Sequence, residues 1–498
     1  MIPRWRKKSR EKRRKIRRCQ AHPALVLALL LLVSYGVGCA SSGKKSSAAK
    51  DRPKRTVILT SKDDVIVGRQ AAESVASQIG LLDDPELVAY VAGIGKKLLR
   101  GLPRREFAYH FAIVDQMEPN AFALPGGHVF VSRGLLALAN NEDELANVLG
   151  HEIIHAAKRH SAQQQAIQRY QSVLSLPRSR AQMMAAYGRD MEREADELGQ
   201  KLAATAGYDP MGMSTFMRRL DQRERLLIGA PRAPTFFDSH PGSRERASVN
   251  SMRSRELRWT RDPSLGNTRE RLLDRIDGMV IGDRPETGVF VGERFMHPAL
   301  GFEIRFPKGW DVQNSTQTVG ARTRRGEAVV YLTVDMPEGD LVELADGFAA
   351  KLADEAGIKV TERKRVKLGS IDALRYTMTG GGMGRSLTAR VTFFPFAGST
   401  WRIVGLTHAA AANRYLPQIL LTTRSFGPLT ATHRGEIRIE RLHVVLAHAG
   451  EDLRRMGQRT GNAWAPGVTA LINGMLGNEI FKGGELMKII RTEGLKAN

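Results

Sequence analysis

Cysteine is scarce in this chain, and long apolar runs are scarce as well. Only two cysteines, Cys19 and Cys39, occur among 498 residues. A disulfide-stapled scaffold is therefore not expected, and a chain of this length can bury cores of its own. The main apolar run, residues 24–38, is shorter than the roughly 20 residues that a membrane-spanning helix needs. A bundle of transmembrane helices is not expected either.

Acidic and aromatic residues are also few. The chain carries 76 Lys and Arg against 52 Asp and Glu, a formal net charge of +24, and only 6% of its residues are aromatic. Residues 1–38 hold eleven of the basic residues and one Glu, which leaves +14 for the remainder. Because this remainder is spread out and has no interleaved aromatic residues, nucleic acid is not an expected partner. We assign it to solvated faces, with anionic lipid or cell wall as neighbours.

The N-terminal segment, residues 1–38, predicts a secretory signal, since a basic run precedes a short apolar run and small residues. Residues 38–41, Gly-Cys-Ala-Ser, resemble the cleavage site of bacterial lipoproteins, in which Cys39 would become the lipidated first residue. Gly36 departs from that pattern, where relatives usually have Leu. The resemblance implies a periplasmic protein anchored in the outer membrane, because Ala and Ser rather than Asp follow the cysteine. An uncleaved signal anchor in the inner membrane is the alternative.

Removal of the signal would also remove Cys19, so the mature protein would contain no disulfide. Residues 39–60 are small, polar and basic, and we predict a flexible tether there.

One stretch, residues 141–155, has a pattern that is typical of a metal site. Its apolar spacing predicts a single helix with Asn141 as N-cap and Glu144 in the capping-box position. His151 and His155 would leave one face of this helix a turn apart and could hold one zinc ion, with Glu152 beside it as general base. A buried helix that happens to carry two histidines is the alternative. His160 lies five positions beyond His155, off that face, and is expected at the surface.

The residues before this helix predict a pair of strands. Residues 106–114 alternate as a strand, and residues 120–132 indicate two strands joined by a turn at Pro125-Gly126-Gly127. Asn120, Ala121, Phe122 and Ala123 could form an exposed edge that pairs with an extended peptide. A hairpin with no substrate role is the alternative. Two helices precede these strands, with the second beginning at Pro85.

A second helix, ending near Gly207, offers acidic residues that could complete the site. Open catalytic zinc sites often use two His and one Glu. Glu192 could reach the metal while Asp196, four residues on, accepts a hydrogen bond from a ligating imidazole. From the residues alone Glu194 is an equal candidate for the ligand, and a solvated acidic face is the alternative. Residues 161–180 are polar and Gln-rich, which suits a mobile segment over the cleft.

Four landmarks together resemble the HtpX- and BepA-like branch of the zinc metallopeptidases that are related to CAAX prenyl proteases. They are Asn120-Ala-Phe-Ala-Leu-Pro-Gly-Gly, residues 142–155, Glu192-Arg-Glu-Ala-Asp196 with residues 206–210, and Ser239-His-Pro-Gly-Ser-Arg-Glu-Arg246.

The resemblance implies that Glu192, and not Glu194, is the third zinc ligand. It also implies that His240 and Arg246 act as catalytic residues that steady the oxyanion, or that His240 reversibly caps the zinc. Ala247 departs from the usual Ile, and we expect only a packing effect. The implied activity is a zinc metalloendopeptidase that acts on unfolded or stalled envelope proteins in outer-membrane quality control.

The sequence predicts a multidomain protein. Residues 61–257 would form a mainly helical, zincin-like α+β protease domain, followed by a helix and linker over residues 258–290. Residues 291–430 alternate as strands around one helix at 341–356, which predicts an α+β domain with an antiparallel sheet. Residues 302–310 resemble the entry strand of PsbP- and Mog-like domains, and residues 380–384 are expected to form a hairpin turn.

The last module, residues 436–492, has a βααβ pattern that resembles a degenerate LysM repeat. The resemblance implies that it binds the N-acetylglucosamine chains of peptidoglycan. Docking against the protease domain is the alternative. Two functions other than proteolysis therefore remain open: a chaperone or assembly lipoprotein with latent protease activity, and a structural lipoprotein that binds the cell wall.

Overall fold

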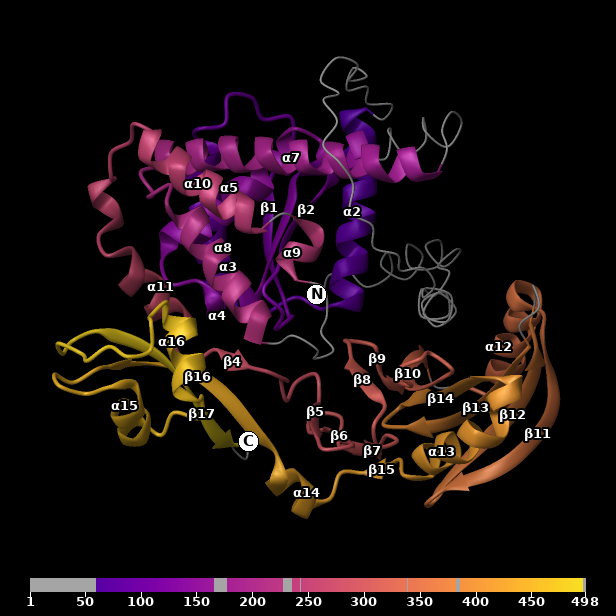
Figure 1. The fold of residues 1–498 in the computed structure, drawn as a ribbon. Coiled ribbons are helices and arrows are strands. Elements are labelled where there is room, and N and C mark those ends of the chain that lie inside the picture. The colour runs from indigo at the N-terminus through magenta and orange to yellow at the C-terminus, as the bar shows by residue number, and fades with distance from the viewer. Residues whose placement is uncertain are drawn as a thin grey trace, which may run out of the picture. The chain divides into compact units, whose positions relative to one another are not determined.

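The computed structural model describes residues 60–164, 177–226, 235–241, 243–337, 339–381 and 386–495 (Figure 1). Contacts within the described chain separate a sheet-rich unit, Glu303–Gly427, from a larger unit made of the residues on either side of it. The expected signal, the Cys39 lipidation site and the tether up to residue 59 lie outside the described residues. Among the helices that the structure describes, none combines the length and the apolar composition that crossing a membrane requires.

The larger unit begins with two helices, α2 (Ser61–Gln78) and α3 (Pro85–Leu99). Thr60 caps α2 in a capping box with Asp63, and the Asp84 side chain accepts the Leu87 N–H at the start of α3. Pro85 occupies the first turn of α3, where its missing N–H costs no hydrogen bond. Both helices agree with the sequence prediction.

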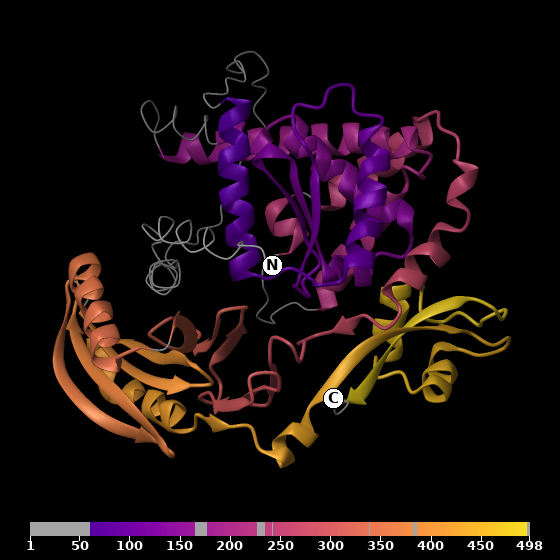
Figure 2. The same cartoon turned by 180° about the vertical axis from the view of Figure 1, so that it is seen from behind.

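A small sheet of order β1-β3-β2 follows these helices. Strand β1 (His110–Val114) is shorter than the predicted 106–114 and runs parallel to β3 (His128–Ser132). Strand β2 (Ala121–Leu124) pairs antiparallel with β3 through the tight turn η1 (Pro125–Gly127), as predicted. Helix α2 packs along β2, β3 and this turn (Figure 2).

Helices build the remaining layer of the larger unit around α5 (Glu142–Ala157). Helix α7 crosses α5 and continues beyond it (Figure 1). The other helices are α4 (Arg133–Leu138), α7 (Pro177–Thr205), α8 (Gly212–Leu226), α9 (Phe236–Ser239), α10 (Ser243–Glu256) and α11 (Thr268–Ile276). Residues 161–164 and 177–180 are helical, so the segment predicted as mobile is regular at both ends, and 165–176 lie outside the description.

The main core of the larger unit is an apolar cluster to which α3, α5 and the sheet all contribute, and a separate cluster fills the C-terminal module. On α5, Leu145, Val148, Leu149 and Ile153 are completely buried, which accounts for the apolar spacing of its sequence. At about 25 cal/mol per Å² of buried apolar surface, such side chains each contribute roughly 2 kcal/mol. Helix α5, which carries His151 and His155, is therefore buried in this core.

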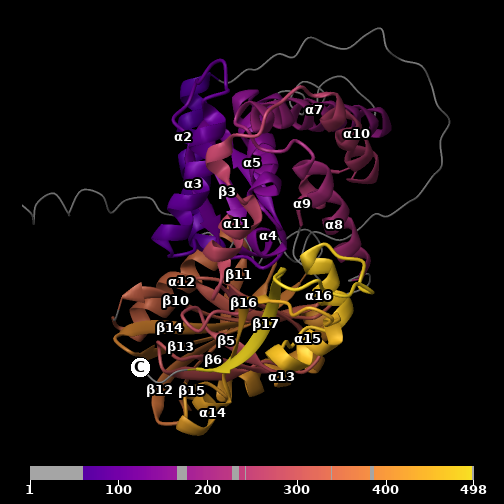
Figure 3. The same cartoon turned by 90° about the vertical axis from the view of Figure 1, so that its left-hand side faces the viewer.

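A C-terminal module completes the larger unit and has the predicted βααβ order. It consists of β16 (Arg438–Leu446), α15 (Leu453–Thr460), α16 (Pro466–Asn473) and β17 (Leu486–Gly494), with β16 and β17 antiparallel and β4 (Val280–Ile281) beside β16. Strand β17 ends two residues beyond the predicted end of the module at residue 492. Leu442 belongs to the main core, and α16 contacts α4 and α8 (Figure 3).

A buried lysine ties this module to α4. Nζ of Lys488 on β17 donates to the carbonyl oxygens of Ala137 and Ala139 at 2.7 and 2.8 Å and lies 3.3 Å from that of Leu138. These are carbonyls at the C-terminal end of α4, which no later turn of that helix can satisfy. Arg269 adds a bond from α11 to the Leu486 carbonyl at 2.8 Å. The contacts support the docking alternative for this module.

The sheet-rich unit contains a seven-stranded sheet of order β11-β12-β13-β14-β10-β9-β8. Helix α12 (Leu341–Ala356) has the predicted bounds and packs on the face that carries Tyr376, Phe393 and Val404. Helix α13 (Ala412–Arg424) was not predicted; its Ile419 packs against Gly405, whose neighbour Val404 points to the α12 face.

The strands of the seven-stranded sheet are β8 (Asp311–Asn314), β9 (Thr318–Arg322), β10 (Ala328–Pro337), β11 (Ile358–Leu368), β12 (Ile371–Gly380), β13 (Leu387–Phe396) and β14 (Ser399–His408). A smaller sheet of order β15-β7-β6-β5 is made of β5 (Val289–Val291), β6 (Arg294–His297), β7 (Phe302–Arg305) and β15 (Gly427–Pro428). Strands β12 and β13 form an antiparallel hairpin, which agrees with a turn near 380–384, although 382–385 lie outside the description.

Candidate metal centre

Helix α5 carries His151, Glu152 and His155. Its N-terminus is fixed by contacts of the backbone and side chain of Glu144. The Asn141 side chain accepts the N–H of Glu144 at 2.9 Å, as predicted for the N-cap. The predicted capping box does not close, because the Glu144 carboxylate accepts the N–H of Asn140 and pairs with Arg219 at 2.6 Å. Burial raises the pKa of Glu144, but Arg219 outweighs this effect and the net shift is downward.

Two glycines let α7 touch the backbone of α5 beside the histidines. A Cβ atom added at Gly199 would lie 2.7 Å from the backbone N of His151, and one at Gly150 would lie 2.8 Å from the carbonyl O of Gly199. Real Cβ atoms do not approach other atoms so closely. The two helices can therefore cross at this distance only with glycine at both positions, and the crossing brings the acidic residues of α7 to the ligand face of α5.

We expect Gly199→Ala to force the two helices apart. Overpacking of this kind costs about 1–3 kcal/mol, and the separation should weaken metal binding roughly tenfold by moving Glu192 away from the histidines. Thermal unfolding and zinc competition with a chelator would measure both effects. Gly188→Ala on the same helix is the matched control, because no atom lies within 4 Å of its added Cβ. A Gly199→Ala protein that matched this control would contradict the prediction.

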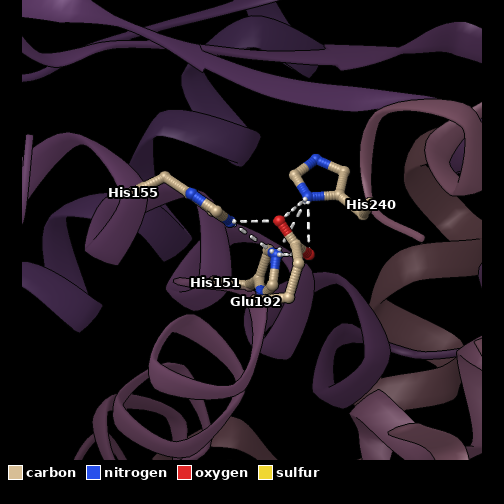
Figure 4. Close-up of side chains that lie close together, drawn as sticks. All are labelled: His151, His155, Glu192 and His240. Atoms are coloured by element: carbon tan, nitrogen blue, oxygen red, sulfur yellow. Dashed lines mark hydrogen bonds and ion pairs between the residues drawn. The ribbon is translucent and has the colours of Figure 1, made fainter. Parts of the chain in front are cut away.

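Four side chains converge on one point between α5, α7 and the segment after α9 (Figure 4). They are His151, His155, Glu192 and His240, and their ligand atoms all lie within 4.8 Å of one another. The Nε2 atoms of His151 and His155 are 3.0 Å apart, and each lies 3.4 Å from a carboxylate oxygen of Glu192. Two imidazoles and a carboxylate are donors that suit zinc.

His240 enters the same cluster through its Nδ1 atom. That atom lies 3.0 Å from Oε2 of Glu192 and 3.2 Å from Nε2 of His151. The ring stacks on Phe236, with the ring centroids 4.3 Å apart. The structure thus places His240 among the ligand atoms themselves.

Glu152 faces the cluster without a hydrogen bond. Both of its carboxylate oxygens are buried and accept no hydrogen bond from any group in the described part of the chain. Nε2 of His240 lies 3.3 Å from Oε1. Burial raises the pKa of Glu152, while the neighbouring histidines oppose that shift. A buried carboxylate of raised pKa and free lone pairs is suited to accept a proton from a water molecule.

Asp196 and Arg246 support the cluster from behind. Oδ1 of Asp196 lies 3.0 Å from Nδ1 of His151, on the ring edge opposite the ligand atom. Arg246 makes two bonds to Asp196, at 2.8 and 2.6 Å, and its Nη1 lies 2.8 Å from Oε2 of Glu192. Its guanidinium therefore binds the carboxylates of both Glu192 and Asp196 on α7.

These contacts shift the pKa values in opposite directions. Burial raises the pKa of Asp196, but Arg246 overcomes it and the pKa falls to about 2. Burial lowers the pKa of His151, but hydrogen bonds to Asp196 and Glu192 raise it to about 9. The pKa of His155 is lowered well below its usual value by burial and by the charge of His151. The buried carboxylates thus give the site a strong preference for bound positive charge.

Glu194 lies outside the ligand cluster, as the resemblance implied, whereas His160 differs from its predicted setting. Glu194 is absent from the ligand cluster, and its Oε1 pairs with Lys158 at 3.1 Å. The prediction that His160 lies at the surface is wrong, because only 1% of the residue is exposed. Its Nδ1 lies 2.9 Å from Nδ1 of His155. The helix is interrupted at residues 158–159 and resumes at His160, so continuous helical spacing could not place this residue.

The predicted substrate edge lies beside this cluster. Ala121, Phe122 and Ala123 belong to β2, which is an edge strand of its sheet, and α5 contacts β2. Asn120 precedes the strand, and its backbone N–H donates to Oγ of Ser132 at 2.8 Å. Of these residues, Ala121 is buried and the others are partly exposed.

The family profile described as Peptidase family M48 matches residues 85–187 and 170–253, which include His151, Glu152, His155, Glu192, Asp196, His240 and Arg246. Residues 85–253, about a third of the chain, are thus similar to peptidase family M48 and form the M48 segment. The M48 segment therefore contains α5, α7 and the His240–Arg246 segment.

Two relatives of known name each match about a third of the chain. The chain is 33% identical over 171 residues to mitochondrial metalloendopeptidase OMA1 of Schizosaccharomyces pombe, covering 32% of this chain and 50% of that protein. It is 28% identical over 202 residues to the beta-barrel assembly-enhancing protease of Escherichia coli, covering 36% and 41%. The chain thus spans about half the length of these relatives or less.

Among solved structures, cyanobacterial PsbP from Synechocystis is similar at 12% identity, with a TM-score of 0.24, over 28% of this chain and 95% of that chain. A similarity at this score supports no conclusion. The PsbP-like and LysM-like resemblances of the segments outside the M48 match remain predictions.

Proposed function

We propose that this protein is a zinc-dependent metalloendopeptidase that hydrolyses peptide bonds of envelope proteins. The observation that carries the proposal is the buried cluster of His151, His155 and Glu192 with the unbonded carboxylate of Glu152 beside it, inside an M48 segment. The donor set fits zinc, which takes nitrogen and carboxylate ligands and leaves a position for water at catalytic sites.

His151, His155 and Glu192 would hold one zinc ion. Bound there, zinc supplies a Lewis acid that polarises the scissile carbonyl and lowers the pKa of a water molecule. Glu152 would accept a proton from the attacking water and pass it to the leaving amine, as its raised pKa and unbonded oxygens allow. Asp196 fixes the tautomer of His151 by holding the proton on Nδ1.

Arg246 and His240 complete the proposed mechanism. The resemblance implied that both steady the oxyanion, or that His240 reversibly caps the zinc. The contacts of Arg246 with Asp196 and Glu192 support a positioning role for it, because its guanidinium is committed to those two carboxylates. His240 is better placed to act on substrate, since it lies beside both Glu152 and Glu192.

The substrate is proposed to bind as an extended segment along β2, where an edge strand can offer backbone hydrogen bonds. One matched relative is named for enhancing beta-barrel assembly, which supports unfolded or stalled outer-membrane proteins as the substrate class. The lipid anchor at Cys39, the periplasmic location and a peptidoglycan contact through residues 436–492 belong to the same proposal.

A second candidate function is a chaperone or assembly lipoprotein whose protease activity is latent. The position of His240 favours it, because Nδ1 of His240 lies among the ligand atoms. There it would cap the zinc and exclude water until a partner or substrate moved it.

We expect the purified protein to hold about one zinc per chain and His151→Ala to lose it. The substitution removes one of three ligands from a buried site, so peptidase activity on an unfolded envelope protein should fall at least 10³-fold. Metal analysis and a cleavage assay measure the two quantities. His448→Ala is the control, because His448 lies at the surface of the C-terminal module. Zinc retained at parental levels by His151→Ala would contradict the ligand assignment.

A further inference from the structure

The ligand histidine His155 has a buried histidine behind it. Its Nε2 faces Glu192 and His151, and its Nδ1, on the other edge of the ring, lies 2.9 Å from Nδ1 of His160. The two rings meet edge to face with centroids 4.8 Å apart. His160 is 1% exposed, so this contact is shielded from water.

A strained residue brings His160 to this position. Helix α5 ends at Ala157, and Arg159 adopts φ 55°, the left-handed conformation that an L-residue adopts only at a cost of about 1–2 kcal/mol. Nε of Arg159 donates to Oδ2 of the buried Asp64 on α2, which holds the turn. The chain therefore folds back, and His160 returns to a ring that a continuous helix would carry away from it.

The protons of the two rings follow from their partners. If Nε2 of His155 is to offer its lone pair to zinc, the neutral ring must carry its proton on Nδ1. That N–H then donates to Nδ1 of His160, so His160 must carry its own proton on Nε2. The Nε2 atom of His160 lies 3.5 Å from Oε2 of Glu194. The two rings therefore have one consistent pair of tautomers, and the contact of His160 with Glu194 is an ion-pair distance rather than a hydrogen bond.

Glu194 is the last residue in the series His155, His160 and Glu194, and a lysine balances its charge. Lys158 pairs with its other oxygen at 3.1 Å. The carboxylate is less buried than the site, with 23% of its side chain exposed. Helix α7 thus provides three acidic residues at intervals of two: Glu192 reaches the ligand atoms, Asp196 contacts Nδ1 of His151, and Glu194 contacts the histidine behind His155.

We propose that His160 is a positioning residue that fixes the tautomer and orientation of His155 for zinc, and that Glu194 acts through His160. The inference rests on the proposed zinc site and gives each ligand histidine its own acceptor: Asp196 for His151 and His160 for His155. It also assigns a role to the glutamate that the sequence left as an equal candidate for the ligand.

The test compares the zinc affinity of purified full-length variants by competition with a chromogenic chelator. His160→Leu removes the acceptor and should weaken zinc binding about 10- to 100-fold, the usual effect of losing a partner of a ligating histidine. His160→Asn keeps an acceptor atom at the position of Nδ1 and should bind within about threefold of the parent. A role in packing alone would not separate these two variants in this way, since both shorten the side chain.

Glu194 is tested in both backgrounds. Glu194→Ala should weaken zinc binding several-fold in the parent and have no further effect in His160→Leu, because its contribution passes through His160. Glu197→Ala, on the exposed side of α7, is the matched control and should leave affinity unchanged.

Equal affinity of His160→Leu and the parent would overturn the inference while leaving the zinc site intact. So would additive losses in the double variant, or His160→Asn binding as weakly as His160→Leu. If His160→Leu failed to fold, the comparison of His160→Asn with Glu194→Ala would decide the question by the same criteria. A parent protein without zinc would instead overturn the proposed function itself.

Discussion

Glu152→Gln is expected to abolish peptide hydrolysis while zinc stays bound. Glutamine keeps the size and shape of the side chain but cannot accept the proton of the attacking water. Loss of a general base typically lowers the rate by about 10²–10⁴-fold. Glu152 is not a ligand in the proposed site, and its oxygens accept no hydrogen bond within the described residues. The fold and the metal content should therefore be preserved.

The measurement has two parts. Cleavage of an unfolded envelope protein and zinc content are compared for the parent, Glu152→Gln and the control Glu197→Gln, in which the same change is made on the exposed side of α7. The variants are then expressed in a host that lacks the gene. A phenotype that matches the deletion supports the protease function. If Glu152→Gln restored the host fully while cleaving nothing, the chaperone function would replace it.

Lys488→Met is expected to destabilise the larger unit by about 3–5 kcal/mol, because the buried carbonyl oxygens that contact Nζ would lose their charged hydrogen-bond donor. The three carbonyl oxygens that Nζ contacts at the end of α4 are buried away from water, and each unsatisfied carbonyl costs about 1–3 kcal/mol. Burial and the nearby Arg219 and Arg269 lower the pKa of Lys488. Three acceptors nevertheless need three N–H donors, which only the ammonium form offers.

Thermal and urea unfolding would measure this loss, with a fall in Tm of roughly 10 °C for a unit of this size. Lys482→Met is the matched control, because Lys482 lies in the same module with its side chain exposed. Surface substitutions usually change the free energy of unfolding by no more than about 0.5 kcal/mol. If the free energies of unfolding of Lys488→Met and this control differed by no more than that, the module would not support α4.

Local patterns predicted the elements that depend on neighbours in sequence. The N-cap at Asn141, the bounds of α12 and the turn after β2 were predicted correctly, because capping residues, apolar spacing and turn glycines act within a few positions. His151 and His155 were also placed on one face by spacing alone. Their geometry needs only a regular helix.

The errors arose where distant residues decide the structure. The Glu144 side chain does not close the expected capping box, because Arg219, 75 residues later, competes for the carboxylate. His160 was placed at the surface because helical spacing was continued through Arg159, where the left-handed conformation is held by Asp64, 95 residues earlier. Residue spacing likewise could not choose between Glu192 and Glu194. The choice depends on where α7 crosses α5, which Gly150 and Gly199 determine.

The bond between Lys488 and Ala137 also sets an order of events during synthesis. The two residues are 351 positions apart, so at about 5–20 residues per second the ribosome adds Lys488 roughly 20 to 70 s after Ala137. Until then the end of α4, directly before the metal-site helix, lacks its partner. A nascent chain that is still being made would therefore carry an incompletely supported metal-site helix. Under the proposed function, proteolysis would begin only after β17 has been made.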